Sequence, residues 1–300
     1  MKVYSRFTPQ MEFMASLYVF EQQAIYKKTD LGAKWRKQVA AELPEDFCRQ
    51  LENKDVSATL TWLHRCIQND LTAGESVEDL LGFVQQEEEE FSPEVCKGIV
   101  GRPPLPAHDV YPLLDAWNDC YFSKLDPAMI AGLRKKQADI QELIGKKTAK
   151  EVINIATNGL SLDNQPDDLV VTLIPQYHAR PVILYHMEGD TYFYQYAADD
   201  IPEKNGALPP VMLRVQQALS DENRLRILKL LAAKPQTFKA IHQYSGLAKS
   251  TVHHHLITLR SAGLVHLHIS PGKPEYYTFR AQGLKELDGR MMDYVYGGLN

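Results

Sequence analysis

Residues 248–265, AKSTVHHHLITLRSAGLV, constrain the fold more than any other part of the chain. Val252, Leu256 and Leu259 recur at intervals of four and three residues, which places them on one face of a helix. Gly263 is expected to end the helix, because glycine readily adopts the left-handed conformation found just past many helix ends. This segment therefore predicts an amphipathic helix with a defined carboxyl end.

The polar side chains of this helix lie mostly away from its apolar face. Lys249, Ser250, His253 and His254 are small or cationic groups near the amino end, and such groups suit the base edges and phosphates of the DNA major groove. We expect His255 to be partly packed. Paired histidines do not by themselves make a metal site, so we predict no metal at this run.

The flanking segments complete a winged helix-turn-helix pattern. Residues 237–244 predict a short helix with Thr237 as its N-cap, followed by a glycine-containing turn at 245–247. Residues 221–233 predict an earlier helix, capped by Ser220. Residues 265–269 and 275–279 alternate like two strands around the basic tip at 270–274, which predicts a wing.

Three motifs together resemble a known family: LSDENRLRILKLL, then LAKSTVHHHLITLRSAGLV, then a second wing strand containing YY. They are similar to the ArsR/SmtB group of bacterial transcriptional regulators, over roughly the last ninety residues. The resemblance implies a homodimeric repressor that leaves its double-stranded operator DNA when an effector binds.

The resemblance also implies which residues contact DNA. They are Lys249, Ser250, Thr251, His253 and His254 on the helix and Lys273 at the wing tip, to which we add Arg260 because it lies off the apolar face. Ala248 departs from the family pattern, which usually has serine there as the N-cap. Loss of such a cap costs about 1 kcal/mol of helix stability.

The metal-binding sites of the family have no counterpart here. Family members that sense metals place cysteine in the helix that corresponds to residues 237–244, or acidic and histidine ligands in the terminal helix. The first helix has no cysteine here, and residues 283–300 contain neither cysteine nor histidine. We therefore predict neither a metal nor a cofactor, because soft-metal sensing requires thiolates.

Charge and length predict two domains. From Leu208 onward the chain has 12 Lys and Arg against 6 Asp and Glu, whereas residues 1–207 have 21 against 32. Only the basic part is expected to meet DNA. We predict a regulatory domain at 1–200 and a DNA-binding and dimerisation domain at 201–300, with a linker at 197–210 rich in charge and proline.

Residues 1–200 predict mainly helices followed by a β-hairpin, so the expected class is mainly α with small β elements. The predicted helices cover residues 8–28, 31–41, 57–71, 76–86, 109–122, 126–144 and 148–158. The predicted strands cover residues 169–174, 182–187 and 191–196. Cys48, Cys66, Cys96 and Cys120 are scattered, so reduced thiols are expected.

The first 200 residues are expected to bind a small-molecule or peptide effector. They contain no nucleophile elbow, phosphate loop or zinc-protease motif, so we predict no enzyme, although His178 and His186 could serve acid–base chemistry. The alternatives are a protein-interaction or dimerisation module, or a cryptic enzyme. No apolar leader or membrane span is evident, so a cytoplasmic protein is expected.

A homodimer is predicted because one recognition helix reads too few base pairs. The predicted seam consists of apolar side chains before and after the helix-turn-helix, spaced for helical faces. They are Val211, Val215, Leu219, Leu284, Leu287, Met291, Tyr294 and Val295.

Overall fold

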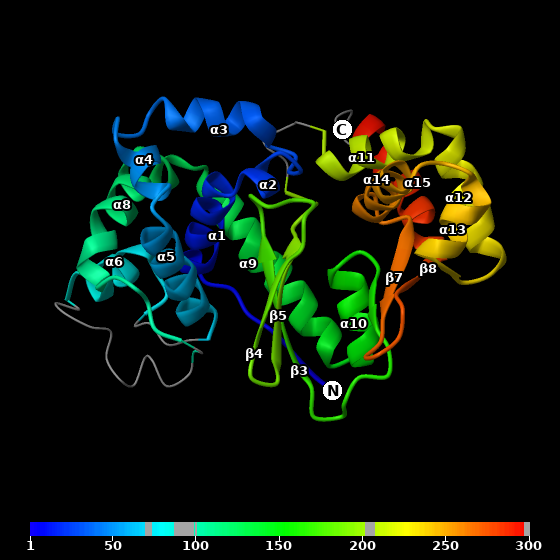
Figure 1. Ribbon diagram of the computed structural model, residues 1–300, viewed down its shortest axis with the longest axis horizontal. Coiled ribbons are helices and arrows are strands. Elements are labelled where there is room, and N and C mark those ends of the chain that lie inside the picture. The colour runs from blue at the N-terminus through cyan, green and yellow to red at the C-terminus, as the bar shows by residue number, and fades with distance from the viewer. Residues whose placement is uncertain (70–73, 87–98, 100, 202–207, 297–300) are drawn as a thin grey trace. The chain divides into compact units, whose positions relative to one another are not determined.

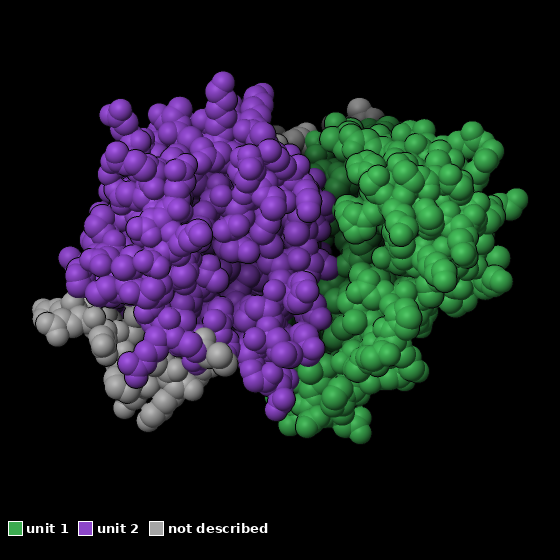
Figure 2. Space-filling view, viewed as in Figure 1, with its two compact units in different colours: residues 1–4, 139–173, 199–300 green, residues 5–138, 174–198 purple. Residues whose placement is uncertain are grey.

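The computed structural model describes residues 1–69, 74–86, 99, 101–201 and 208–296 (Figure 1). The chain divides into two compact units, shown in different colours in Figure 2. Unit 1 comprises residues 1–4, 139–173 and 199–300, and unit 2 comprises residues 5–138 and 174–198. Helices predominate and the strands are short, so the predicted mainly α fold class with small β elements is confirmed.

Unit 2 is built largely from helices that agree with the predicted segments. They are α1 (Pro9–Glu21), α2 (Gln23–Tyr26), α3 (Gly32–Ala40), α4 (Phe47–Leu51), α5 (Lys54–Gln68), α6 (Val77–Gln86), α8 (Ala107–Cys120), the 3-10 helix η1 (Phe122–Lys124) and the start of α9 (Pro127–Ile144). The helix predicted at 8–28 is interrupted at Gln22, whose backbone is extended. Thr8, its expected N-cap, makes no side-chain capping bond within the described residues.

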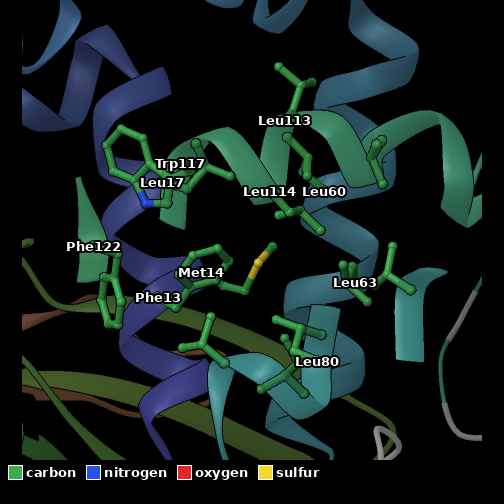
Figure 3. Close-up of a cluster of buried hydrophobic side chains, with 14 of the residues drawn as sticks. Phe13, Met14, Leu17, Leu60, Leu63, Leu80, Leu113, Leu114, Trp117 and Phe122 are labelled. Atoms are coloured by element: carbon green, nitrogen blue, oxygen red, sulfur yellow. The ribbon is translucent and has the colours of Figure 1, made fainter. Parts of the chain in front are cut away.

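The core of unit 2 forms where α1, α5, α6 and α8 meet (Figure 3). Phe13, Leu63, Leu114 and Trp117 are completely buried there. Helix α1 is buried on nearly every side, as expected for a helix that is apolar around its circumference. This helix therefore forms the centre of unit 2, and the other helices cover it.

A buried polar network crosses this core. Glu12 and His178 have no exposed side-chain surface and form an ion-pair contact, and the backbone N–H groups of Tyr177 and His178 donate to Glu12. The other ring nitrogen of His178 lies 2.7 Å from the Tyr121 hydroxyl. Both nitrogens of His178 are thus engaged, so this residue supports the core and is not free for acid–base chemistry.

A four-stranded sheet has the order β1-β3-β5-β4, with strands β1 (Lys2–Ser5), β3 (Val170–Gln176), β4 (Leu184–Glu188) and β5 (Thr191–Ala197). The predicted hairpin at 182–196 is confirmed. Its strands β4 and β5 are antiparallel, with Glu188 opposite Thr191 and Tyr185 opposite Tyr194.

Unit 1 contains the helix-turn-helix and its wing. Its elements are the end of α9, α10 (Ala149–Ala156), β2 (Leu160–Leu162), α11 (Pro210–Leu219), α12 (Glu222–Ala233), β6 (Gln236–Thr237), α13 (Phe238–Ser245), α14 (Lys249–Ser261), β7 (Val265–Ile269), β8 (Tyr276–Phe279) and α15 (Gln282–Tyr296), with most of β1 and the start of β3. A second sheet has the order β2-β7-β8-β6.

The compact units differ from the predicted division at residue 200. Residues 139–173 belong with the winged helix, because β2 pairs in parallel with β7 and sits at one edge of the wing sheet. The capping box predicted at the start of α10 is present between Thr148 and Glu151. Residues 202–207 of the predicted linker lie outside the described residues, and Asp199 at its start is buried.

Cys48, Cys66 and Cys120 are free thiols, and Cys96 lies outside the described residues. In the described part of the chain, no helix combines the length and apolar character needed to cross a membrane.

Candidate nucleic-acid interface

The helix-turn-helix is formed by α13 and α14. Thr237 caps α13 by accepting a hydrogen bond from the Ala240 N–H at 3.3 Å, as predicted. Gly246 ends α13 in the left-handed conformation, with φ of 67°, and the chain turns there into α14. Glycine suits this position because a side chain would strain a positive φ.

Helix α12 precedes this motif and begins one residue later than expected. Asp221 is its N-cap, and its carboxylate accepts from the Arg224 N–H at 3.0 Å. The prediction that Ser220 caps this helix is therefore wrong. A carboxylate cap satisfies the same amides and also lies favourably at the positive end of the helix dipole.

The inner face of α14 is the predicted apolar stripe. Val252, Leu256 and Leu259 are at most 2% exposed and pack in the apolar core of unit 1. The core partners include Ile227 and Leu231 of α12. Burial of this stripe sets which face of α14 is left for solvent.

The outer face of α14 carries most of the predicted contact residues. Lys249, Ser250, His253 and His254 are exposed, and Thr251 is half-buried. The structure thus brings these side chains together near the amino end of one helix. Ile257, farther along α14, is 39% exposed and was not singled out in the sequence because an apolar residue there suggested packing.

Arg260 has a different role from the one predicted. Its guanidinium donates to the backbone carbonyl of Asn158 at 3.2 Å. Burial and the nearby Arg280 lower the pKa of Arg260 to about 10. The side chain is directed into unit 1 at the far end of α14, so the structure does not support its assignment to the DNA-contacting set.

His255 is buried, as expected. The side chain is 5% exposed, and neither ring nitrogen has a hydrogen-bond partner among the described residues. Burial lowers its pKa, so the ring is neutral at pH 7. Within the described ranges, no group of three His, Cys, Asp or Glu side chains could hold a metal ion.

The wing is a tight antiparallel hairpin. Strands β7 and β8 pair with Val265 opposite Phe279 and His268 opposite Tyr276. Lys273 lies at the exposed tip, where its N–H donates to the Ser270 carbonyl at 3.2 Å. The predicted wing and the exposure of Lys273 are both in place.

A segment from before the linker binds the wing, and the sequence did not reveal it. The Asp163 carboxylate accepts from the His268 ring and from the Tyr276 hydroxyl, both at 2.9 Å. Ser161 donates to the same carboxylate at 3.0 Å. Burial raises the pKa of Asp163, but these hydrogen bonds outweigh that effect and the pKa is lowered. We call Asp163, His268 and Tyr276 the wing clasp.

Asp199 joins two further parts of unit 1. Its carboxylate accepts from the Asn158 amide at 3.0 Å and forms an ion pair with Arg214 of α11. Asn154 lies 2.8 Å from the ring of His266 on β7. Residues on both sides of the first 200 positions are therefore integrated into the winged helix, and only the folded chain shows this.

The predicted dimer seam separates into two classes. Val211 and Val215 are 3% exposed, and Leu219, Leu287 and Met291 pack against the same core, so these five stabilise the unit itself. The exposed apolar side chains of the terminal helix are Leu284, Met292, Tyr294, Val295 and Tyr296, of which Met292 and Tyr296 were not predicted.

The comparisons with known proteins agree with this geometry. Residues 221–266 match the family model described as "Bacterial regulatory protein, arsR family". No curated protein sequence matches this chain.

Three solved structures resemble the same region. NolR from Sinorhizobium fredii is 25% identical over 29% of this chain and 86% of its own, with a TM-score of 0.24. A possible transcriptional regulatory protein from Mycobacterium bovis (fragment 1–100) is 29% identical over 30% of this chain and 96% of its own, with a TM-score of 0.25. A homodimeric winged helix-turn-helix DNA-binding domain, from a possible ArsR-family regulator of Mycobacterium bovis, is 27% identical over 32% and 89%, with a TM-score of 0.26.

The matched residues include α12, α13, α14 and the start of the wing, which are the elements that place the exposed row on α14. Through this carboxyl-terminal module the chain belongs to the arsR family of bacterial regulatory proteins, and the module is the DNA-binding part of a transcriptional regulator.

Proposed function

We propose that this protein is a sequence-specific transcriptional repressor that binds operator DNA as a homodimer. One observation carries the proposal: Lys249, Ser250, His253 and His254 form an exposed row on the helix whose opposite face is buried. A helix presented in this way fits the major groove, where side chains near its amino end reach base edges. The inference of repression rests on the family match alone.

The wing supports the proposal by adding a cation beside the helix. Lys273 is exposed at the tip of a short hairpin, where it can contact a phosphate. Tyr244, at the end of α13, is 53% exposed and is a second candidate for a backbone contact. Phosphate contacts position a protein on DNA, whereas base contacts select the sequence.

The dimer rests on the exposed apolar side chains of α15. Tyr294, Val295 and Tyr296 are each more than half exposed, and a row of this kind is unfavourable in water unless another surface covers it. A second copy of the chain would cover it and would place two recognition helices on a palindromic site. Because chromosomal DNA is the proposed partner, we place the protein in the bacterial cytoplasm, and the proposal assigns it no catalytic reaction.

The test is selection from a random duplex library with the full chain, followed by titration of the selected site at several salt concentrations. Ser250→Ala is expected to change the preferred sequence at a cost of about 1–3 kcal/mol. Lys273→Ala is expected to weaken all sequences alike and to reduce the salt slope by about 0.9 log units per log unit of salt.

Lys37→Ala is the matched control, because it removes the same charge from an exposed position in unit 2. It should leave both the preferred sequence and the salt slope unchanged. Failure to select any sequence, or binding that does not respond to salt, would refute the proposed function.

We also propose that unit 2 receives the signal that controls DNA binding, through a small-molecule or peptide effector. The support is that unit 2 has its own apolar core and lies outside the matched family segment. The size of a typical allosteric coupling, about 1–3 kcal/mol, corresponds to a change in operator affinity of about 5–150-fold.

A further inference from the structure

Unit 2 contains a cavity of about 300 Å³ between two helices and the β4–β5 hairpin. Its walls include Tyr18 of α1, His64 and Gln68 of α5, and Leu184, His186 and Gln195 of the hairpin. The volume lies at the lower end of the range for small-molecule sites. All of these residues belong to unit 2, so the cavity is complete within one compact body.

Two polar atoms at this cavity are buried and lack a partner. Gln195 is 4% exposed, and its Oε1 makes no hydrogen bond with any described residue. The Nε2 atom of His186 is likewise buried and unpartnered among those residues. Buried polar groups in folded proteins are nearly always hydrogen-bonded, so each such atom calls for an explanation. A ligand in the cavity would supply it.

The rest of the polar wall holds these groups in place. The Nε2 atom of His64 lies 3.0 Å from the Gln68 amide nitrogen and 3.2 Å from the Gln195 amide nitrogen. The Gln195 amide is thereby held by its nitrogen while its oxygen is left free. The His186 ring stacks on Phe193 at 4.7 Å with an interplanar angle of 1°, which fixes the direction of its nitrogens.

The cavity presents no unpaired charged group among its described lining residues. Arg65 is the one cationic side chain there, and its Nε donates to Glu188 at 2.9 Å. Burial lowers the pKa of His64 to about 3 and that of His186 to about 4, so both rings are neutral at pH 7. A charged ligand would lose its hydration without gaining a free counter-charge, which is unfavourable.

We propose that this cavity binds an uncharged, planar aromatic or heteroaromatic molecule that donates an N–H or O–H hydrogen bond to Gln195 Oε1 and meets His186 Nε2 with a second polar group. Tyr18, Leu184 and the His64 ring supply apolar and aromatic surface for the flat part of the ligand. The class includes primary aromatic amides and pyrimidine-like bases. The proposal deepens the effector role of unit 2, and in that respect it rests on the proposed function.

The chain itself connects this site to the DNA-binding unit. Gln195 lies on β5, four residues before Asp199, and Asp199 binds both Asn158 and Arg214 of unit 1. A ligand that holds Gln195 can therefore bias the strand that leads directly into unit 1. Such a connection is physical but does not by itself measure coupling.

The test uses the full chain and three probes of nearly equal shape: benzamide, which is neutral, benzoate, which is an anion, and benzamidine, which is a cation. Binding is measured by calorimetry and by the ¹⁵N chemical shift of His186 Nε2. Benzamide is expected to bind and to move that resonance. The two charged probes are expected to bind at least about ten-fold more weakly, because their desolvation is not compensated.

Gln195→Leu removes the free acceptor and is expected to weaken benzamide binding by about ten-fold or more, since a hydrogen-bond partner is lost. The control is His108→Leu on α8, an exposed site in unit 2 outside the cavity, which should bind benzamide like the parent. The ¹⁵N measurement on the unmodified chain keeps the test valid if Gln195→Leu does not fold.

The proposal is overturned if benzamide at millimolar concentration neither binds nor moves the His186 resonance. It is also overturned if benzoate binds more tightly than benzamide, since Arg65 would then define an anion site. The operator is titrated in the same samples. Benzamide binding with unchanged operator affinity supports the cavity and removes the effector role, whereas absence of any operator binding refutes the regulator and leaves the cavity standing.

Discussion

Burial divides the histidines of this chain into two kinds. His253 and His254 are exposed on α14 and are available to DNA. His64 and His266 lie against the interior, where burial lowers the pKa of His64 to about 3 and that of His266 to about 4. The interior rings are therefore neutral at pH 7, and their hydrogen bonds depend on that neutrality.

The first prediction concerns acid stability and His64. Its folded-state pKa of about 3 lies below the ordinary value of 6.5, so protons bind the unfolded chain first. Stability is therefore lost as the pH falls from about 6.5 toward 3, with a slope of up to about 1.4 kcal/mol per pH unit. His64→Gln keeps a polar group but does not titrate, and it should flatten this dependence.

Urea unfolding of the full chain at several values between pH 4 and pH 7 measures the effect. Exposed His108→Gln provides the control and should retain the parental slope. An unchanged slope in His64→Gln would show that other groups cause the acid sensitivity.

At the scale of elements, the recognition helix α14 begins without a side-chain cap. Ala248 holds an extended conformation at the N-cap, with φ of −59° and ψ of 147°, and an alanine side chain cannot accept a hydrogen bond. The interior face of the helix supplies its stability through Val252, Leu256 and Leu259. Tertiary packing thus compensates for a weak local start signal.

The second prediction follows from that missing cap. Ala248→Ser should stabilise the chain by about 1 kcal/mol, because the serine oxygen can accept from the first free amides of the helix. Thermal unfolding and amide exchange at Ser250 and Thr251 would detect the gain. Ala233→Ser, at the exposed end of α12, serves as the control and should give no comparable gain.

The wing is the second element whose stability depends on a distant segment. Strand β2 pairs with β7, and the Leu267 N–H donates to the Gly159 carbonyl at 2.8 Å. The wing clasp adds the Asp163 carboxylate on the same edge. The wing edge that would otherwise expose unpaired backbone groups is therefore covered by the chain's own β2.

The third prediction is that Asp163→Ala loosens this edge. Loss of the carboxylate leaves His268 and Tyr276 without their shared acceptor, at an expected cost of about 1–3 kcal/mol. Amide exchange at Leu267 should become faster, while exchange in α5 of unit 2 should not. Glu275→Ala, an exposed acid beside the wing tip, should leave the exchange at Leu267 as it was.

At the scale of the whole molecule, the proposed dimer rests on α15. The apolar side chains that remain exposed there include Met292, Tyr294 and Val295, each between 51% and 54% exposed. Val211 and Val215, which the sequence also assigned to the seam, are already buried within unit 1. The dimer surface is therefore narrower than predicted and lies toward the end of the terminal helix.

The fourth prediction is that Tyr294→Glu dissociates the dimer. A charge in a covered apolar surface is strongly unfavourable, so the variant should sediment as a monomer at micromolar concentration. Its affinity for a palindromic site should fall, and its affinity for a single half-site should be retained. Met187→Glu, an exposed apolar position on β4 of unit 2, should remain dimeric like the parent. If the parent chain itself sediments as a monomer, the dimer is refuted.

Local patterns were enough to predict most elements and most of the candidate interface. The spacing of Val252, Leu256 and Leu259 identified the buried face of α14, and the same spacing left Lys249 and His254 on the outside. Thr148 and Glu151 marked the start of α10, because a capping box is a contact between near neighbours.

Contacts between distant residues were decided only by the tertiary structure. Arg260 satisfies the same helical pattern as the contact residues, but the carbonyl of Asn158, about a hundred positions earlier, draws its guanidinium inward. Strand β2 is three residues long and has too little alternation to be recognised until β7 pairs with it. The cavity of unit 2 likewise joins α5 to a hairpin more than a hundred residues later. Sequence periodicity reports which face of an element is buried, whereas the identity of the partner depends on long-range packing that no local pattern encodes.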